Sequence, residues 1–193
     1  MKPITVLFAL AALAFADPSP DKSIGSRSAP ILIDLFSDFQ CPSCKMLHDQ
    51  TLPEMIKDYA KTGKVLLVYH DYPLPMHAHA REAARWANAA GTLGKYKAVG
   101  DALFANQDTW AANGDLRSTV AKALTPAEMQ KVDALMKDPK FDDGVSRDVA
   151  LGSRAGVQGT PTMIMTYKLK NYPITRAVSY PILKQMLDEL LAK

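Results

Sequence analysis

The sequence contains few cysteines and no strong imbalance of charge. It has 193 residues, of which 48% are hydrophobic and only two are cysteines. Two cysteines exclude a disulfide-rich scaffold and a four-thiolate zinc site, so the fold must be held by its own core. The net charge is +3 and no run of Lys and Arg exceeds two residues, which argues against nucleic-acid binding. The length fits one domain with an insertion.

Long apolar runs are also absent, except at the N-terminus. The run Ile4–Ala16 spans about 13 residues, short of the roughly 20 that cross a bilayer. It follows Lys2 and ends in Ala14-Phe15-Ala16, a pattern typical of a cleaved secretory signal peptide. We expect residues 1–16 to be removed and the mature chain to start near Asp17, although a retained membrane anchor is the alternative. The protein is then periplasmic or secreted and meets an oxidising environment.

The remaining segments alternate between strand and helix patterns. Residues 17–30, rich in Pro, Ser, Gly and Asp, predict a tether with a short edge strand near residues 23–26. A helix is expected from Cys41, with an interruption at Pro53. Residues 76–156 read as almost wholly helical, and a last amphipathic helix follows Ser179. Apolar or β-branched composition predicts four further strands, at 31–36, 65–69, 162–167 and 174–178.

This order predicts an α/β fold built on one central mixed sheet flanked by helices. Residues 31–75 form a βαβ unit and residues 157–193 a ββα unit, and the helical insertion 76–156 separates them.

The motif Cys41-Pro42-Ser43-Cys44 carries the chemistry. A lone Cys-x-x-Cys is half a zinc site or a redox pair. This motif follows a buried strand and opens a helix. The free N–H groups and the dipole at the start of a helix stabilise a thiolate. Cys41 is therefore the predicted nucleophile. Cys44 lies one turn deeper on the same face and is the predicted resolving cysteine. Pro42 limits fraying of the first turn, and Ser43 adds a hydroxyl without charge.

The segment Ser37–Cys44 resembles the active-site segment of DsbA-like thiol:disulfide oxidoreductases of the thioredoxin-like superfamily. Val157–Thr162 resembles the family's Gly-Thr-Pro loop, and Asp71–His77 resembles the segment that enters its helical insertion. The resemblance implies a thioredoxin-like fold and a redox-active disulfide with no separate cofactor. It also implies a cis Pro161 beside the cysteines, with the backbone of Thr160 facing Cys41 and free to pair with an extended substrate.

The chain departs from the family's pattern at two places, Leu35 and Ser43. The superfamily often buries an acid six residues before the first cysteine, where this chain has Leu35. Asp34 is one residue earlier and is expected on the opposite face of its strand, which argues against a role in proton transfer. Asp38 is expected on the rim of the site with a role in proton transfer, or else as a helix-entry turn residue. Ser43 replaces the histidine of the strongest oxidants, which predicts a less oxidising protein.

The resemblance implies a disulfide donor that acts on reduced or unfolded secreted proteins and is recharged by a quinone-linked membrane oxidase. The short tether leaves no room for an added dimerisation domain, which favours a monomer. Met76 and Met163 are candidates for an apolar peptide-binding groove, although core packing is the favoured role of Met163. One alternative is a disulfide reductase or isomerase served by a membrane thiol reductant. Others are a non-enzymatic metal-binding module that uses Cys41, Cys44 and His48, and a binding domain whose disulfide is only structural.

Overall fold

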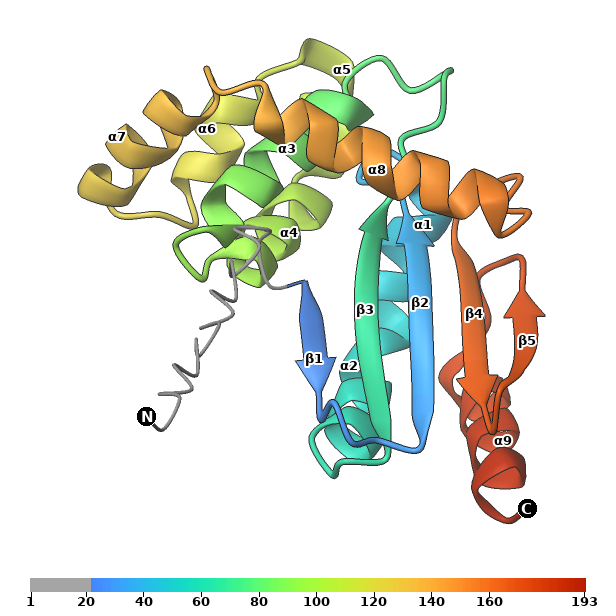
Figure 1. The fold of residues 1–193 in the computed structure, drawn as a ribbon. Helices are drawn as coiled ribbons and strands as arrows, with labels where there is room; N and C mark the ends of the chain where they lie inside the picture. Colours follow the sequence, from blue (N-terminus) through green and yellow to red (C-terminus); the bar gives the residue numbers. More distant parts are fainter. Residues whose placement is uncertain (1–21) are drawn as a thin grey trace, which may run out of the picture.

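The computed structural model describes residues 22–193, so the expected signal peptide and the start of the tether lie outside them. A five-stranded sheet in the order β1-β3-β2-β4-β5 forms the centre (Figure 1). Strands β2 and β3 are parallel, and the other neighbours are antiparallel. The predicted mixed sheet is therefore confirmed. The strands are β1 (Ser23–Gly25), β2 (Ile31–Ser37), β3 (Val65–Asp71), β4 (Thr162–Tyr167) and β5 (Lys170–Ile174).

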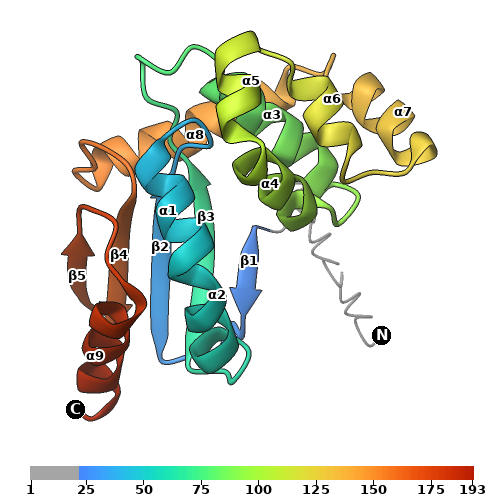
Figure 2. The same ribbon diagram turned by 180° about the vertical axis from the view of Figure 1, so that it is seen from behind.

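Helices cover both faces of the sheet. On one face lie α1 (Pro42–Gln50), α2 (Leu52–Met55), a π-helical turn (Ile56–Ala60) and α9 (Tyr180–Leu191), as seen in Figure 2. Helix α8 (Lys140–Arg154) crosses the other face near the upper ends of the strands (Figure 1). The rest of the insertion packs beside the sheet as α3 (Ala80–Gly91), α4 (Tyr96–Ala105), α5 (Gln107–Asn113), α6 (Leu116–Ala121) and α7 (Pro126–Leu135).

Two apolar cores hold these layers together. Alternation along β2 sends Ile31, Ile33 and Leu35 into a core shared with α1, α2 and α9. The second core fills the insertion around the fully buried Trp110, and it includes both cysteines. Tyr69 packs against both cores, at the junction between the sheet and the insertion. The active-site segment thus lies between the core of the sheet and the core of the insertion.

Local signals explain most of the helix boundaries. Thr125 and Glu128 form the capping box that starts α7, and Pro126 occupies its first position. Helix α5 falls within the predicted helical insertion but was not predicted as a separate helix, because Gln107–Asn113 lacks a clear apolar period. It ends at Gly114, whose φ of 73° suits a glycine C-cap.

The second strand of the C-terminal pair differs from the prediction of residues 174–178. It spans Lys170–Ile174, because Lys168 (φ 46°) and Leu169 (φ 62°) reverse the chain directly after β4. Two consecutive left-handed residues are the geometry of a two-residue hairpin turn, which usually contains Asn or Gly. Neither residue type occupies these two positions, so no local signal marked the turn. Pro173 is tolerated because β5 is an edge strand.

Replacing Leu169 by glycine should stabilise the protein. Its side chain is 98% exposed, so little packing is lost. A left-handed residue with a Cβ costs roughly 1–2 kcal/mol, of which the entropy of glycine in the unfolded chain cancels a part. We expect Leu169→Gly to raise the free energy of unfolding by about 0.5–1 kcal/mol in urea denaturation. Leu169→Ala keeps the Cβ and should give no gain; an equal gain from alanine would contradict this explanation.

Candidate active site

Cys41 is the N-cap residue of α1, with φ −78° and ψ 122°. The helix therefore begins at Pro42, one residue later than predicted. The backbone N–H groups of Cys44 and Lys45 donate to the carbonyl of Cys41, both at 3.1 Å. The extended N-cap backbone places the sulfur of Cys41 at the positive end of the helix dipole.

Thr160 and Pro161, in the loop directly before β4, lie beside the nucleophile. The Thr160–Pro161 peptide bond is cis, the conformation that the family resemblance implies. The sulfur of Cys41 lies 3.4 Å from the carbonyl oxygen of Thr160, to which it can donate only while it is a thiol. Antiparallel pairing of β4 with β2 brings this loop to Cys41, 119 residues earlier in the chain. The structure thus brings together the residues of the two predicted motifs.

The two thiols differ sharply in acidity. A hydrogen bond from the Cys44 thiol lowers the pKa of Cys41 to about 5, against the opposing effect of burial. Thr160 and the backbone N–H groups of Cys44 and Ser43 lower that pKa further. Burial raises the pKa of Cys44 well above its usual value, and its side chain is only 1% exposed. The pair therefore holds one thiolate, on Cys41, with Cys44 as its proton donor.

Asp38 is 2% exposed, so it does not lie on the rim, and its contacts fit the alternative expectation of a helix-entry turn residue. Its Oδ1 accepts from the backbone N–H of Gln40 at 2.7 Å. Its Oδ2 accepts from the backbone N–H of Leu74 at 2.8 Å and pairs with Nδ1 of His77 at 2.7 Å. Its own backbone N–H lies 3.4 Å from the sulfur of Cys44. The carboxylate thus ties the active-site loop to the segment that enters the insertion, while a role in proton transfer stays a prediction.

Two glutamines that the sequence did not single out support the same loop. The Nε2 of Gln107, on α5, donates to the carbonyls of Phe39 at 2.7 Å and Cys41 at 3.1 Å. Gln40 accepts from the backbone N–H of His79 at 2.8 Å. An amide has no distinctive sequence pattern, and α5 was itself unpredicted, so no signal pointed to Gln107.

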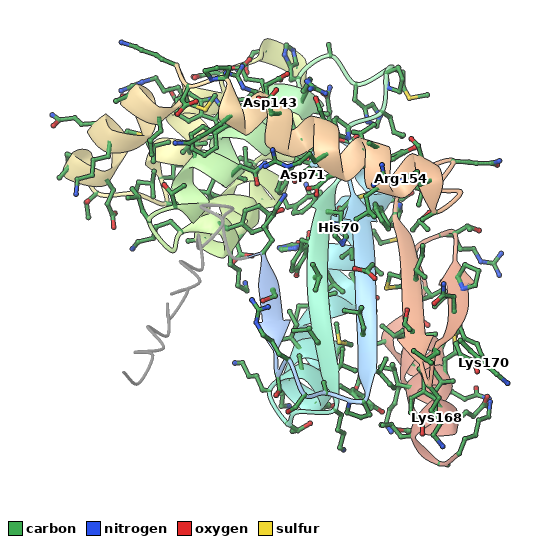
Figure 3. The ribbon with its side chains drawn as sticks, in the orientation of Figure 1. His70, Asp71, Asp143, Arg154, Lys168 and Lys170 are labelled. Carbon is green, nitrogen blue, oxygen red and sulfur yellow. The ribbon has the colours of Figure 1, made fainter. Side chains whose placement is uncertain are left out.

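Asp34 lies on the opposite face of β2 from Leu35, as predicted. Its Oδ1 is 2.8 Å from Nε2 of His70, which also approaches Asp148 of α8. Lys22 adds ion pairs of 2.6 Å with both Asp71 and Asp148. Figure 3 shows His70 and Asp71 at the end of β3, beneath α8. Asp34 thus belongs to an ionic network that joins the N-terminal segment, the sheet and the insertion.

His48 does not approach the cysteines as a third ligand. Its Nε2 pairs with Asp101 at 3.1 Å and its ring stacks on Phe104. Across residues 22–193, no group of three or more His, Cys, Asp or Glu side chains is arranged to hold a metal ion. The same part of the chain contains no helix long and apolar enough to cross a membrane.

A family model described as thioredoxin matches residues 19–188. The chain belongs to the thioredoxin family. The solved structure of alpha-DsbA1 from Wolbachia pipientis superposes with a TM-score of 0.75 at 22% identity, covering 89% of this chain and 91% of that one. Oxidised BdbD from Bacillus subtilis gives a TM-score of 0.68 at 24% identity, over 91% and 94% of the two chains. The predicted thioredoxin-like fold with a helical insertion is thereby confirmed.

Curated relatives point the same way within the thioredoxin family. The probable disulfide bond formation protein D of Bacillus cereus is 24% identical over 91% of this chain and 81% of its own length. The Na(+)/H(+) antiporter NhaA 3 of Salinispora tropica is 28% identical over 81% of this chain. The match covers only 23% of the antiporter's own length, so this chain corresponds to a part of that protein. The predicted assignment to DsbA-like thiol:disulfide oxidoreductases is confirmed.

The acidity of Cys41 should depend on the hydrogen bond from Cys44. In Cys44→Ala the largest cause of the lowered pKa is gone, so the midpoint of thiolate absorbance at Cys41 should rise above about 5. Cys44→Ser keeps a donor of similar size and should hold the midpoint lower than alanine does. Equal midpoints in the two variants would show that the helix terminus, and not Cys44, governs the acidity.

Stability should fall in alkali because of His70. Burial disfavours the imidazolium, but hydrogen bonds to Asp148 and Asp34 outweigh it and raise the pKa of His70 from 6.5 to about 9. The stabilisation that protonated His70 gives to the folded state is therefore complete below about pH 6.5 and is lost as the pH rises through about 9. Urea denaturation between pH 6 and 10 should show this loss in the wild type and a flatter profile in His70→Asn. A matching slope in the variant would assign the loss to other groups.

Proposed function

We propose that the protein is a periplasmic or secreted enzyme that donates its Cys41–Cys44 disulfide to other proteins. The observation that carries the proposal is the stabilised thiolate of Cys41, with a pKa of about 5. A stabilised thiolate favours the dithiol form of the enzyme, so its disulfide is more readily given away. The same thiolate is the better leaving group when a mixed disulfide breaks down.

The reaction balances as two exchanges at sulfur. A substrate thiolate attacks the sulfur of Cys41, so the bond to Cys44 breaks and Cys44 leaves and takes up a proton. A second substrate thiolate then attacks the substrate sulfur of the mixed disulfide, and Cys41 leaves as a thiolate. The substrate has lost two electrons and gained a disulfide, and the enzyme has been reduced. A membrane partner of the quinone-linked oxidase class would accept these electrons and restore the Cys41–Cys44 disulfide.

The surroundings of Cys41 support an extended polypeptide as substrate. The backbone of Thr160 borders the sulfur, where main-chain pairing to an extended segment is geometrically natural. Among the described side chains, Met46 on α1 and Met76 in the segment held by Asp38 are 46% and 75% exposed. Unfolded, reduced secreted proteins offer the apolar segments that such side chains contact. Met163 is fully buried in the sheet core, its favoured role, and so does not contribute to such a surface.

The reduction potential decides the direction of exchange. We expect the Cys41–Cys44 couple to lie below the about −120 mV of DsbA, because Ser43 adds no charge beside the thiolate, but above the about −270 mV of thioredoxin. The couple is titrated against glutathione, and oxidation of a reduced peptide is followed beside reduction of insulin. Cys41→Ser should abolish both activities. A potential near that of thioredoxin would make the protein a reductase, with a thiol reductant as its membrane partner.

A further inference from the structure

The two loops of the active site extend beyond the pairing of β2 with β4. The last pair of these strands joins Phe36 to Thr162. The cysteine loop, residues 37–41, follows the first of these, and the cis-proline loop, residues 157–161, precedes the second. Between the loops, the sulfur of Cys41 approaches the opposite carbonyl at 3.4 Å, and sulfur is only a weak hydrogen-bonding group. The separation of the two loops therefore depends on other contacts.

Tyr72 makes a hydrogen bond with each of these loops. It begins the entry segment, residues 72–79, which connects β3 to α3. Its hydroxyl donates to the carbonyl of Val157, the first residue of the cis-proline loop, at 2.9 Å. Its backbone N–H donates to the carbonyl of Ser37, the first residue of the cysteine loop, at 2.8 Å. One residue thus spans both halves of the active site.

The ring of Tyr72 is held in place between β2 and α8. Its centroid lies 6.1 Å from that of Phe36, and the two rings are nearly perpendicular, at 86°. A Cβ at Gly152 of α8 would lie 2.7 Å from Cε2 of Tyr72 and 2.9 Å from Cδ1 of Phe36. Packing this close leaves the ring little freedom to move. The position of the hydroxyl therefore follows from the packing of α8 on the sheet.

The end of α8 fixes the other side of Val157. Gly156 has a φ of 78°, and the backbone N–H groups of Gly156 and Val157 donate to the carbonyls of Ser153 and Gly152 at 3.1 and 2.9 Å. This pair of hydrogen bonds is a Schellman motif. The N–H of Val157 is thus bound to the helix, and its carbonyl is bound to Tyr72. Together the two bonds set the direction in which the loop runs toward the cis proline.

The far end of the entry segment contacts the cysteine loop again. Pro73 and Pro75 restrict the backbone of the segment. The Nδ1 of His77 pairs with the carboxylate of Asp38 at 2.7 Å. The backbone carbonyl of Asp38 in turn accepts from the N–H of Cys41 at 3.1 Å. The segment is therefore a stiff link, with the cis-proline loop at its start and the cysteines at its far end.

We propose that Tyr72 is a positioning residue for exchange with polypeptide substrates, because its hydroxyl and its N–H set the gap between the cis-proline loop and the cysteine loop. The proposal rests on the disulfide exchange proposed above. An extended substrate brings its sulfur to Cys41 while its main chain pairs with Thr160. Both contacts form together only at the correct separation, and a misplacement of about 1 Å can slow a reaction about a hundredfold. A small dithiol has no main chain to pair and does not need this gap.

Reduction of the oxidised protein by two different thiols tests this role. One is an extended peptide with two cysteines, and the other is dithiothreitol; acid quenching and mass analysis follow both reactions. Tyr72→Phe keeps the ring and its packing and loses only the hydroxyl. We expect its second-order rate with the peptide to fall roughly three- to tenfold, the effect of one net hydrogen bond. The rate with dithiothreitol and the equilibrium constant with glutathione should change by less than about twofold, since the cysteines themselves are undisturbed.

Tyr180→Phe is the matched control, because it also deletes a bonded tyrosine hydroxyl, which donates to Asp58 in the π-helical turn. It should lower the free energy of unfolding and leave both rates unchanged. His77→Phe, at the other end of the entry segment, should slow both thiols alike, because it loosens Asp38 and with it the cysteines.

Three outcomes would overturn the role of Tyr72. They are an unchanged peptide rate in Tyr72→Phe, an equal loss of rate with both thiols in that variant, and a loss specific to the peptide in His77→Phe. The last would mean that any disturbance of the entry segment has the same effect. A wild-type protein that dithiothreitol reduces and the peptide does not would instead overturn the proposed function.

Discussion

The hydrogen bond from the buried thiol of Cys44 to the sulfur of Cys41 is the interaction on which the chemistry depends. This hydrogen bond has its effect because the two cysteines, three residues apart in the chain, lie in different surroundings. Cys41 lies outside the first turn of α1, where free N–H groups and the Thr160 loop meet its sulfur. Cys44 lies under that turn, where burial keeps it protonated. The difference in acidity thus follows from where the helix begins, and Pro42 at its first position helps to set that point.

The rest of the structure holds this helix start in place from three sides. Strand β2 delivers the loop, and β4 brings the cis proline beside it. The third side is the insertion, through Gln107 on the backbone of Cys41 and through Asp38, whose carboxylate reaches the segment before α3. Gln107 and Asp38 are themselves buried, and these contacts give their polar side-chain atoms partners. The insertion therefore acts as a wall of the active site and does more than cover the sheet.

The sequence predicted the features that rest on local patterns. The strand before Cys41, the helix after it and the capping box at Thr125 are all signals within a few residues. The features that could not be predicted depend on residues far apart in the chain or on an unusual backbone conformation. Gln107 is recognisable only once α5 lies against Phe39, and the turn at Leu169 has no residue that favours a left-handed conformation. Asp38 was expected on the rim because its buried partners, Leu74 and His77, are brought to it only by the folded chain.

The ionic network ties the N-terminal segment to the sheet and to the insertion. Lys22 stands before the first strand, Asp71 ends β3, and Asp148 belongs to α8, yet one ammonium group bridges both carboxylates. Removing a buried cation would leave two carboxylates facing each other in a setting of low polarity, which costs far more than an exposed ion pair contributes. The N-terminal segment is therefore held by charge as well as by the short β1 pairing.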